Sequence, residues 1–418
     1  MGRMMYGALP RLRIYTSPSQ YWDVARALIS RKPRHGGQVD RLERNIERLF
    51  GVRHAIAMPM ARVAIYATLR NLILPGQQVI LSPYTIADVV NMVICAGGVP
   101  VFADIKRETC NIDPDEVARL ISKDTGAVLV THFYGLAADL DRLRAICDRH
   151  SVPLIEDAAQ AFGGRLDGKL AGTIGKAGIF SFGVYKNVNS FLGGMIVTDD
   201  SALADRVRAE VGSWPYPPLR LYLEKVISGA TVDIVTHPAI FRNFSFWLFR
   251  YAFLHDINAI NNRLKTDFDP KIKRVIPPEY LWRMMPLQAT MILKQLDRVD
   301  NDTSARIAAA KMYDAGLNDL EELILPPLRE DGTHIYWYYP IQFHERHSLV
   351  RHAMRNQRDI TESYHRNCAE LPCFVEYRRE CPNAEATASS LIYLPTYPRY
   401  SHAEIQRTIA AIRQFFGR

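Results

Sequence analysis

The sequence predicts an α/β fold built on a mainly parallel sheet, and two patterns carry this prediction. Helical and strand patterns alternate from about residue 40 to about residue 200. The strand patterns are short, nearly continuous runs of Val, Ile and Leu, which indicate strands covered by helices on both faces. Of 418 residues, 48% are apolar and 23% charged, an ordinary globular composition that excludes disorder, collagen and coiled coil for the whole chain.

The first elements follow from spacing and end signals. Residues 38–50, QVDRLERNIERLF, carry apolar side chains at helical intervals and end at Gly51, a good helix C-cap. A second helix is expected over 64–74, where Pro75-Gly76 stops it. A short buried strand is expected over 79–81.

The alternation continues beyond this strand. We predict, in chain order, a helix over 87–96, a strand over 99–105, a helix beginning at Pro114, a strand over 127–132, a helix over 139–150 and a strand over 152–156. Asp113 has the position of an N-cap for the helix that begins at Pro114. Because ligands of such sheets bind at the carboxyl ends of the strands, candidate site residues are sought there.

The first candidate is Asp157, at the carboxyl end of the strand in VPLIEDAAQAFGG, with Gln160 about one helical turn later. Glu156 and Asp157 are adjacent, so on a strand their side chains point to opposite faces and do not act as a pair. A lone carboxylate in a buried crevice needs a cationic partner. A protonated pyridine nitrogen, as in pyridoxal phosphate (PLP) enzymes, is one such partner, and a helix N-cap aspartate is the alternative reading.

The second candidate is Lys186, which lies between the strand-like runs GIFSF and MIVT in a loop rich in Gly, Ser and Asn. A lysine in a cleft, with a lowered pKa, can form a Schiff base. A solvated loop lysine is the alternative. Neither motif is specific alone, but the two together, in this order, are.

These motifs resemble the DegT/DnrJ/EryC1/StrS family of sugar aminotransferases. The matching runs are FGVRHAIAM, PGQQVILSP, AGGVPVFADI, NIDPDEV, THFYG, VPLIEDAAQAFGG, GKLAGTIGKAGIFSF, GGMIVTDD and LIYLPTYPRYSHAEI. The resemblance implies a fold type I PLP-dependent transferase. It implies a large domain over 1–276 with a seven-stranded, mainly parallel sheet, and a smaller α+β C-terminal domain over 277–418. Residues 214–276 lie outside the family pattern and read as an atypical insertion.

The resemblance also implies roles for individual residues. Lys186 would carry the Schiff base with PLP and act as the catalytic base and acid. Asp157 would pair with the pyridinium nitrogen, Gln160 would lie near the ring and its phenolic oxygen, and Ser181 would donate to the phosphate. The cofactor would therefore be pyridoxal 5'-phosphate.

Two departures affect the cofactor site. Where family members read Ser-Gly-Thr-Ala-Ala, this chain has Met60-Ala61-Arg62-Val63-Ala64. Because arginine binds phosphate bidentately, Ala61 and Arg62 are expected to hold the phosphate, with an ion pair between Arg62 and a nearby acid as the alternative. The family's stacking aromatic appears as Ile86, so either Tyr84 supplies the ring or an aliphatic contact serves.

A third departure affects the subunit contact. The family's Asn-Tyr-Arg, which reaches the neighbouring subunit's phosphate, appears as Leu281-Trp282-Arg283. The sequence therefore does not support that contact at Leu281, although the resemblance still implies a homodimer.

The implied reaction moves an amino group from an amino acid, usually glutamate in this family, to a keto-sugar that is commonly nucleotide-linked. Dehydratases of the family carry histidine in place of the lysine, so Lys186 favours transamination. A non-catalytic or regulatory member is one alternative, and an aminotransferase acting on a lipid-linked acceptor at a membrane surface is another.

The net charge of 52 − 44 = +8 is concentrated in the insertion, where 9 Lys/Arg against 5 Asp/Glu give +4. Within it, AIFRNFSFWLFRYAFL places Arg242 and Arg250 close to one helical face among aromatic residues. Such a helix suits peripheral membrane contact through 238–255, and packing, a dimerisation arm or a lid are the alternatives. No nucleic-acid partner is expected, because no helix-turn-helix, zinc or RRM signature occurs.

The cysteine pattern and the N-terminal segment bear on metal binding and location. None of the six cysteines forms a C-x-x-C pair or lies at zinc-site intervals from histidines, so no metal site is expected. The segment MGRMMYGALPRLRIY has no apolar core of a secretory signal, and no apolar run approaches the ~18 residues of a spanning helix. A cytoplasmic location is therefore expected.

Overall fold

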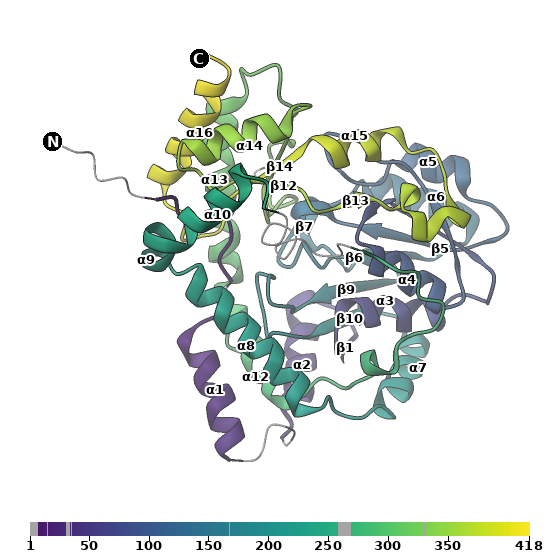
Figure 1. Cartoon of the computed structure of the whole chain (residues 1–418). Helices are drawn as coiled ribbons and strands as arrows, with labels where there is room; N and C mark the ends of the chain where they lie inside the picture. Colours follow the sequence, from purple (N-terminus) through teal and green to yellow (C-terminus); the bar gives the residue numbers. More distant parts are fainter. Residues whose placement is uncertain are drawn as a thin grey trace.

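A seven-stranded sheet forms the centre of the computed structural model, which describes residues 7–14, 16–30, 34, 36–166, 168–257, 269–329 and 331–418. The strand order is β1-β10-β9-β6-β5-β2-β4 (Figure 1). The strands are His54–Met58 (β1), Gln78–Leu81 (β2), Val99–Phe102 (β4), Thr125–Thr131 (β5), Leu154–Asp157 (β6), Ala177–Ser181 (β9) and Gly194–Thr198 (β10). Strands β4, β2, β5, β6 and β9 are parallel, whereas β10 is antiparallel to β9 and to β1. The predicted α/β fold with a mainly parallel sheet is confirmed.

Helices of the large domain flank this sheet. They are α2 (Gln38–Phe50), α3 (Ala61–Arg70), α4 (Ala87–Cys95), α5 (Pro114–Leu120), α6 (Leu140–His150), α7 (Ser201–Gly212) and α12 (Pro286–Leu293). Two predicted end signals are confirmed: Gly51 ends α2 with φ 66°, and the Asp113 carboxylate caps α5 by accepting the Asp115 N–H.

The second predicted helix has different ends in the structure. It was expected over 64–74, but α3 begins at Ala61 and ends at Arg70. The side-chain amide of Asn71 donates to the Ala67 carbonyl oxygen at 2.9 Å and to Glu210 at 3.0 Å. This side chain thus satisfies a backbone acceptor of the last turn, and the chain turns before Pro75 is reached.

A smaller α+β unit follows α12. Its antiparallel sheet has the order β11-β14-β12, formed by Tyr339–Gln342 (β11), Leu391–Leu394 (β14) and Thr361–Glu362 (β12). Its helices are α13 (Val299–Leu317), α14 (Arg346–Arg355), α15 (Pro382–Ser390) and α16 (His402–Phe415). The two-residue strand β13 (Arg366–Asn367) pairs with β3 (Tyr84–Thr85), which ties this unit to the large domain.

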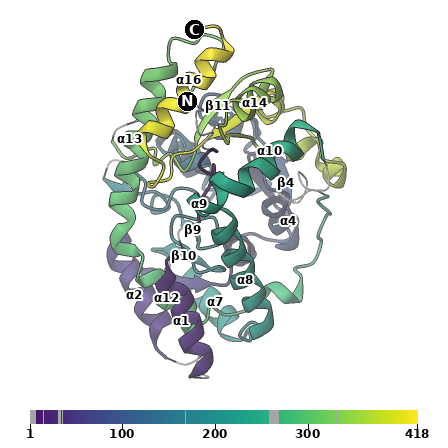
Figure 2. The same ribbon diagram turned by 60° about the vertical axis from the view of Figure 1, so that its left-hand side comes forward.

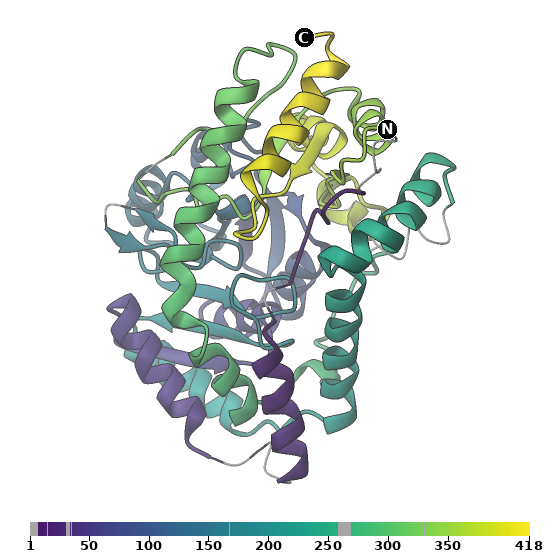
Figure 3. The same cartoon turned by 90° about the vertical axis from the view of Figure 1, so that its left-hand side faces the viewer.

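The insertion connects the two units (Figures 2 and 3). It forms α8 (Leu219–Val235), α9 (Pro238–Ile240), the π-helical turn η2 (Phe241–Ser245) and α10 (Phe246–Leu254). Helix α8 packs on the large domain through Tyr222 and Val226 and lies beside α1 (Pro18–Ile29). Phe241 and Phe246 belong to the core of the smaller unit, whereas α12 packs on α2 of the large domain. The expected boundary at 276/277 stays a prediction, because the two cores interleave around it.

The predicted amphipathic helix over 238–255 has one buried and one exposed face. Its buried side chains include Phe241 and Phe246. Its exposed apolar side chains are Ile240, Phe244, Leu248 and Tyr251. In the part of the chain that the structure describes, no helix is long and apolar enough to cross a membrane.

Candidate active site

Asp157 ends β6 at the carboxyl edge of the sheet, where the sequence places it. Its side chain is only 6% exposed, and burial raises the pKa of its carboxyl group, opposed by the Ala159 N–H and by Lys186. Residues 158–161 form a turn, so Asp157 does not cap a helix. Among the described residues its Oδ1 accepts one hydrogen bond, from the Ala159 N–H at 3.1 Å, and its Oδ2 accepts none. A buried carboxylate oxygen is therefore available for a cationic donor.

Glu156, the neighbour of Asp157, has a structural setting of its own. Its carboxylate accepts hydrogen bonds from the backbone N–H groups of Gly172, Ile174 and Gly175 at 2.6–2.8 Å and from His132 Nε2 at 2.9 Å. Because His132 Nδ1 accepts the Ala138 N–H at 3.1 Å, the ring proton lies on Nε2 and is donated to Glu156. Burial would raise the pKa of Glu156, but these hydrogen bonds outweigh it and lower the pKa.

Lys186 lies in the loop between β9 and β10 and is half-buried. Burial lowers the pKa of its ammonium to about 8, and the charge of Asp157 opposes this shift. The structure thus brings together the two residues that the sequence singled out. A lysine with this pKa is partly neutral near pH 8, as a nucleophilic amine requires.

The glycine pair Gly193-Gly194 brings the end of β9 close to the start of α3. Ser181 ends β9 and pairs in register with Gly194, while Gly193 forms a bridge with Met60, the N-cap residue of α3. A Cβ atom on Gly194 would lie 2.7 Å from the Ala61 nitrogen, so only glycine permits this approach. The Ser181 hydroxyl and the first N–H groups of α3 therefore lie at one edge, an arrangement suited to an anion.

The Arg62 guanidinium forms an ion pair with Asp88, the alternative that the sequence left open. Lys273, from the end of the insertion, pairs with the same carboxylate. Burial would raise the pKa of Asp88, but Arg62 and Lys273 outweigh it and lower the pKa. Among the residues that the structure describes, two cations share this one carboxylate, so the cluster carries a surplus positive charge beside the start of α3.

Gln160 and Tyr84 are joined through Tyr134. The Gln160 side-chain oxygen accepts the Tyr134 N–H at 2.8 Å, and the Tyr134 hydroxyl lies 2.8 Å from that of Tyr84. The Tyr84 ring is fully buried against Phe133 and His365. Its role as the stacking ring stays a prediction, because the Tyr84 ring faces a packed aromatic cluster.

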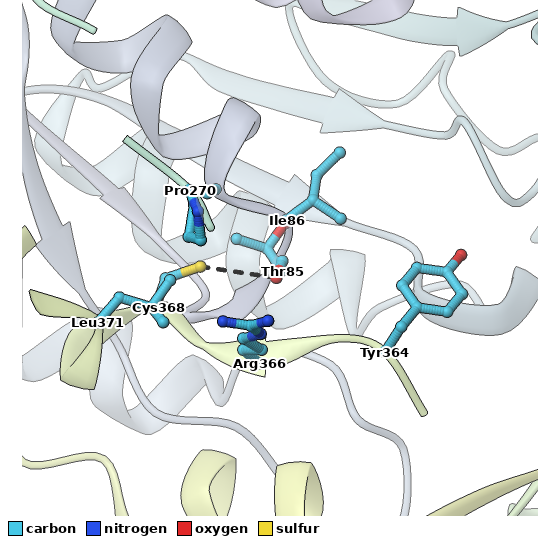
Figure 4. A pocket seen from close by; sticks show the side chains of 8 residues that line it. Thr85, Ile86, Pro270, Tyr364, Arg366, Cys368 and Leu371 are labelled. Atoms are coloured by element: carbon cyan, nitrogen blue, oxygen red, sulfur yellow. Dashed lines mark hydrogen bonds between the residues drawn. The ribbon is translucent and has the colours of Figure 1, made fainter. Parts of the chain in front are cut away.

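The two departures Ile86 and Leu281 have clear positions. Ile86 is the N-cap residue of α4 and lines a small pocket with Thr85, Tyr364 and Arg366 (Figure 4). Leu281 packs against the core of the large domain rather than projecting from it. Neither residue places an aromatic ring or an amide at the site.

The smaller unit contributes two residues that sequence reasoning missed. The Lys186 ammonium nitrogen lies 4.4 Å from the centre of the Trp337 ring. His365 Nδ1 lies 2.7 Å from the Tyr393 hydroxyl, and burial followed by the charge of Lys186 lowers the pKa of His365 to about 3. The aromatic run HIYWYYPIQF was the one signal for Trp337, and the sequence does not show which ring faces the lysine.

The donor set fits PLP. Lys186 offers an amine of lowered pKa for the aldehyde, and the free Oδ2 of Asp157 suits a protonated ring nitrogen. Ser181 and the N-terminus of α3 suit a phosphate. All of these groups come from the carboxyl edge of the sheet or the loops beside it.

Comparison with known proteins also points to a PLP-dependent enzyme. A sequence model of the DegT/DnrJ/EryC1/StrS aminotransferase family matches residues 18–214 and 259–413. The unmatched stretch between them contains most of the insertion.

Three similar proteins span nearly the whole chain. The spore coat polysaccharide biosynthesis protein SpsC of Bacillus subtilis is 29% identical over 390 residues, covering 90% of this chain and 89% of its own. The GDP-perosamine synthase of Vibrio cholerae is 27% identical over 390 residues, covering 91% and 92%. The crystal structure of DesI with its TDP-sugar product is 26% identical, with a TM-score of 0.73, and covers 98% of this chain and 93% of that one.

Proposed function

We propose, from the premise that this chain belongs to the DegT/DnrJ/EryC1/StrS aminotransferase family, that it transfers an amino group from an amino acid to the keto group of a nucleotide-linked sugar. The chain is a PLP-dependent aminotransferase. Lys186 lies in the loop after β9 and Asp157 ends the neighbouring parallel strand β6, and the charge of each acts on the pKa of the other; this placement at one sheet edge is the observation that carries the proposal.

In this proposal Asp157 and Lys186 have different roles. When bound, PLP supplies an electron sink next to the carbon that loses its proton. Asp157 would hold the ring nitrogen in its protonated form through Oδ2. Lys186 Nζ would hold the cofactor through its aldehyde carbon, with loss of water, and once released would carry the substrate's α-proton at Nζ.

The phosphate is proposed to lie against Ser181 and the first turn of α3. The Ser181 hydroxyl and the Ala61 and Arg62 N–H groups would donate to it, and the shared surplus charge of Arg62 and Lys273 would attract a dianion. Arg62 keeps its ion pair with Asp88 in this arrangement. Gln160, whose side-chain oxygen accepts the Tyr134 N–H, would lie beside the ring.

The acceptor class rests on the similar proteins. Two of them carry a nucleotide-linked sugar in their names, GDP-perosamine and a TDP-sugar. We therefore propose a keto-sugar linked to a nucleoside diphosphate as acceptor and glutamate as donor.

The half-reactions test this proposal one at a time. Protein loaded with PLP is mixed with L-glutamate, and loss of the visible cofactor band together with formation of 2-oxoglutarate is expected. Adding GDP- or TDP-linked keto-sugars should restore the band and give an amino-sugar detectable by mass spectrometry. Lys186→Ala is the control. A protein that binds PLP but reacts with no amino acid would favour the regulatory alternative and overturn the proposal.

We also propose a homodimer in the cytoplasm. All six cysteines are free thiols, as suits a reducing compartment. Sedimentation equilibrium of the PLP-loaded protein tests the dimer, and a monomer at micromolar concentration would contradict it.

Peripheral membrane contact through 238–255 is a separate proposal. It rests on the exposed apolar stripe of Ile240, Phe244, Leu248 and Tyr251. Co-sedimentation with anionic vesicles tests it, with Phe244→Ser and Leu248→Ser as the loss variants. Equal pelleting of the variant and the natural chain would remove this proposal.

A further inference from the structure

The Lys186 ammonium faces the indole of Trp337 across the boundary between the two units. The nitrogen lies 4.4 Å from the ring centre, within the range of a cation–π interaction. Trp337 precedes β11 of the smaller unit and is 5% exposed. The contact therefore joins the reacting nitrogen of the large domain to a buried side chain of the other unit.

The backbone around Trp337 is fixed from both sides. Its N–H donates to the Tyr134 carbonyl oxygen at 2.8 Å, and its own carbonyl oxygen accepts from Arg306 Nη1 at 2.8 Å. Arg306 is itself 2% exposed. The preceding residue, Tyr336, has φ 46°, a left-handed conformation that a non-glycine residue adopts at a cost. This clamp and strained residue hold the indole in one place.

Among the described residues, few negative groups lie near the Lys186 amine to stabilise its charge. Within the described part of the chain, Asp157 is the one carboxylate that acts on the pKa of Lys186. In the proposed function, Asp157 is occupied by the protonated ring nitrogen at the time when Lys186 is released as a proton carrier. Two cations would then share one carboxylate. His365, which also faces Lys186, is uncharged near neutral pH because burial lowers its pKa to about 3.

We propose that Trp337 holds the released Lys186 amine in its ammonium form, so that the proton is kept at Nζ until it is returned to substrate. The negative face of the indole supplies the stabilisation that Asp157 cannot give to two cations at once. This proposal rests on the proposed function for its chemistry, but the contact itself exists in the protein without cofactor.

The test measures the Lys186 pKa in the full-length protein without cofactor. Lysines are reductively methylated with carbon-13 formaldehyde and titrated by NMR, and the Lys186 signal is identified by its absence in Lys186→Arg. Chains are made with tryptophan, 5-fluorotryptophan or 5,7-difluorotryptophan, because fluorine weakens the negative face of the ring with little change in shape. The same series in Trp337→Leu serves as the matched control.

The expected result is a Lys186 pKa that falls stepwise with each fluorine, by roughly half a unit or more across the series, and does not change across the series in Trp337→Leu. Trp337→Phe, which retains a weaker aromatic face, should also lower the pKa, whereas Trp214→Phe in the large-domain core should not. A Lys186 pKa that does not change with fluorination when Trp337 is present would overturn the proposal. Such a result would leave the glutamate half-reaction untouched, so the two failures are distinguishable.

Discussion

Glu156 and Asp157 are neighbours in β6, yet among the described residues their two carboxylates share no hydrogen-bond donor. The Glu156 carboxylate accepts hydrogen bonds from the His132 ring and from three backbone N–H groups, whereas the Asp157 carboxylate accepts one, from the Ala159 N–H. Because successive side chains of a strand point to opposite faces, one carboxylate holds the 172–175 loop and the other is left for a ligand.

Substituting each carboxylate separately should show that Glu156 serves stability and Asp157 serves amino transfer. Glu156→Ala leaves four donors without an acceptor, two of them fully buried, so we expect a loss of ~3 kcal/mol or more in the free energy of unfolding. Asp157→Asn should unfold at nearly the urea concentration of the natural chain but lose amino transfer by roughly 100-fold or more. Urea unfolding without cofactor and glutamate half-reaction rates measure the two effects. Equal destabilisation by both variants would contradict this division.

Cofactor uptake should follow the titration of Lys186. Only the neutral amine attacks an aldehyde, and burial lowers the pKa of Lys186 to about 8. The second-order rate of PLP uptake should therefore rise with pH up to about 8 and level off above it, provided the cofactor's own titration is subtracted. Since the charge of Asp157 raises this pKa, the plateau in Asp157→Asn should begin at lower pH. A rate still rising at pH values near the ordinary lysine pKa would contradict a lowered pKa for Lys186.

Arg62 should affect cofactor affinity more than stability. Arg62→Ala removes a cation beside the start of α3, and we expect PLP to bind about tenfold more weakly or worse. Asp88→Asn is the matched control, because it breaks the same ion pair but leaves the Arg62 charge in place. Fluorescence titration of the protein with PLP gives both dissociation constants. If the two variants lose affinity equally, Arg62 acts only through Asp88.

Gly178 should tolerate no side chain. A Cβ atom there would lie 1.9 Å from the Gly172 carbonyl oxygen, in the loop that Glu156 holds. Gly178→Ala is therefore expected to give little folded protein, because β9, which delivers Ser181, would have to move. Gly212→Ala, at the end of α7, meets nothing within 4 Å and should fold normally. Circular dichroism and soluble yield compare the two variants. A well-folded Gly178→Ala would show that the loop around Gly172 can move to admit the side chain.

Glu404 should anchor the insertion to the smaller unit. This carboxylate is 2% exposed and pairs with Arg358, Arg242 and Arg407. Glu404→Ala leaves the buried Arg358 unpaired, and we expect a cost of about 3–5 kcal/mol in the free energy of unfolding. Arg407→Ala removes an exposed partner and should cost less than about 1 kcal/mol. Urea unfolding measures both, and similar values would argue against a buried anchor.

The sequence allowed prediction of the parts of the site that lie in one stretch of chain. Asp157 ends the strand pattern of β6 and Lys186 lies in the loop after β9, so their placement at one sheet edge could be predicted from the parallel topology. The Arg62–Asp88 ion pair could not be assigned, because it joins two helices whose relative rotation the sequence does not give.

Trp337 and His365 were missed for a similar reason. They reach Lys186 only through packing of the smaller unit on the large domain, and nothing in the local pattern of either segment gives that placement. The expected end of the second helix at residue 74 was wrong because the side chain of Asn71 satisfied the last turn. Local patterns thus predicted which segments form strands but not their exact ends, since the strand expected over 99–105 ends at Phe102. Contacts between units had to come from the structure.

The most direct test of the account is to identify the residue that holds the cofactor. The purified protein is loaded with PLP, reduced with borohydride, digested and analysed by mass spectrometry. We predict one modified peptide, with the pyridoxyl group on Lys186, and loss of the visible cofactor band on reduction. A modified lysine elsewhere, or a natural chain that takes up no cofactor at all, would contradict the assignment of Lys186 as the residue that holds PLP.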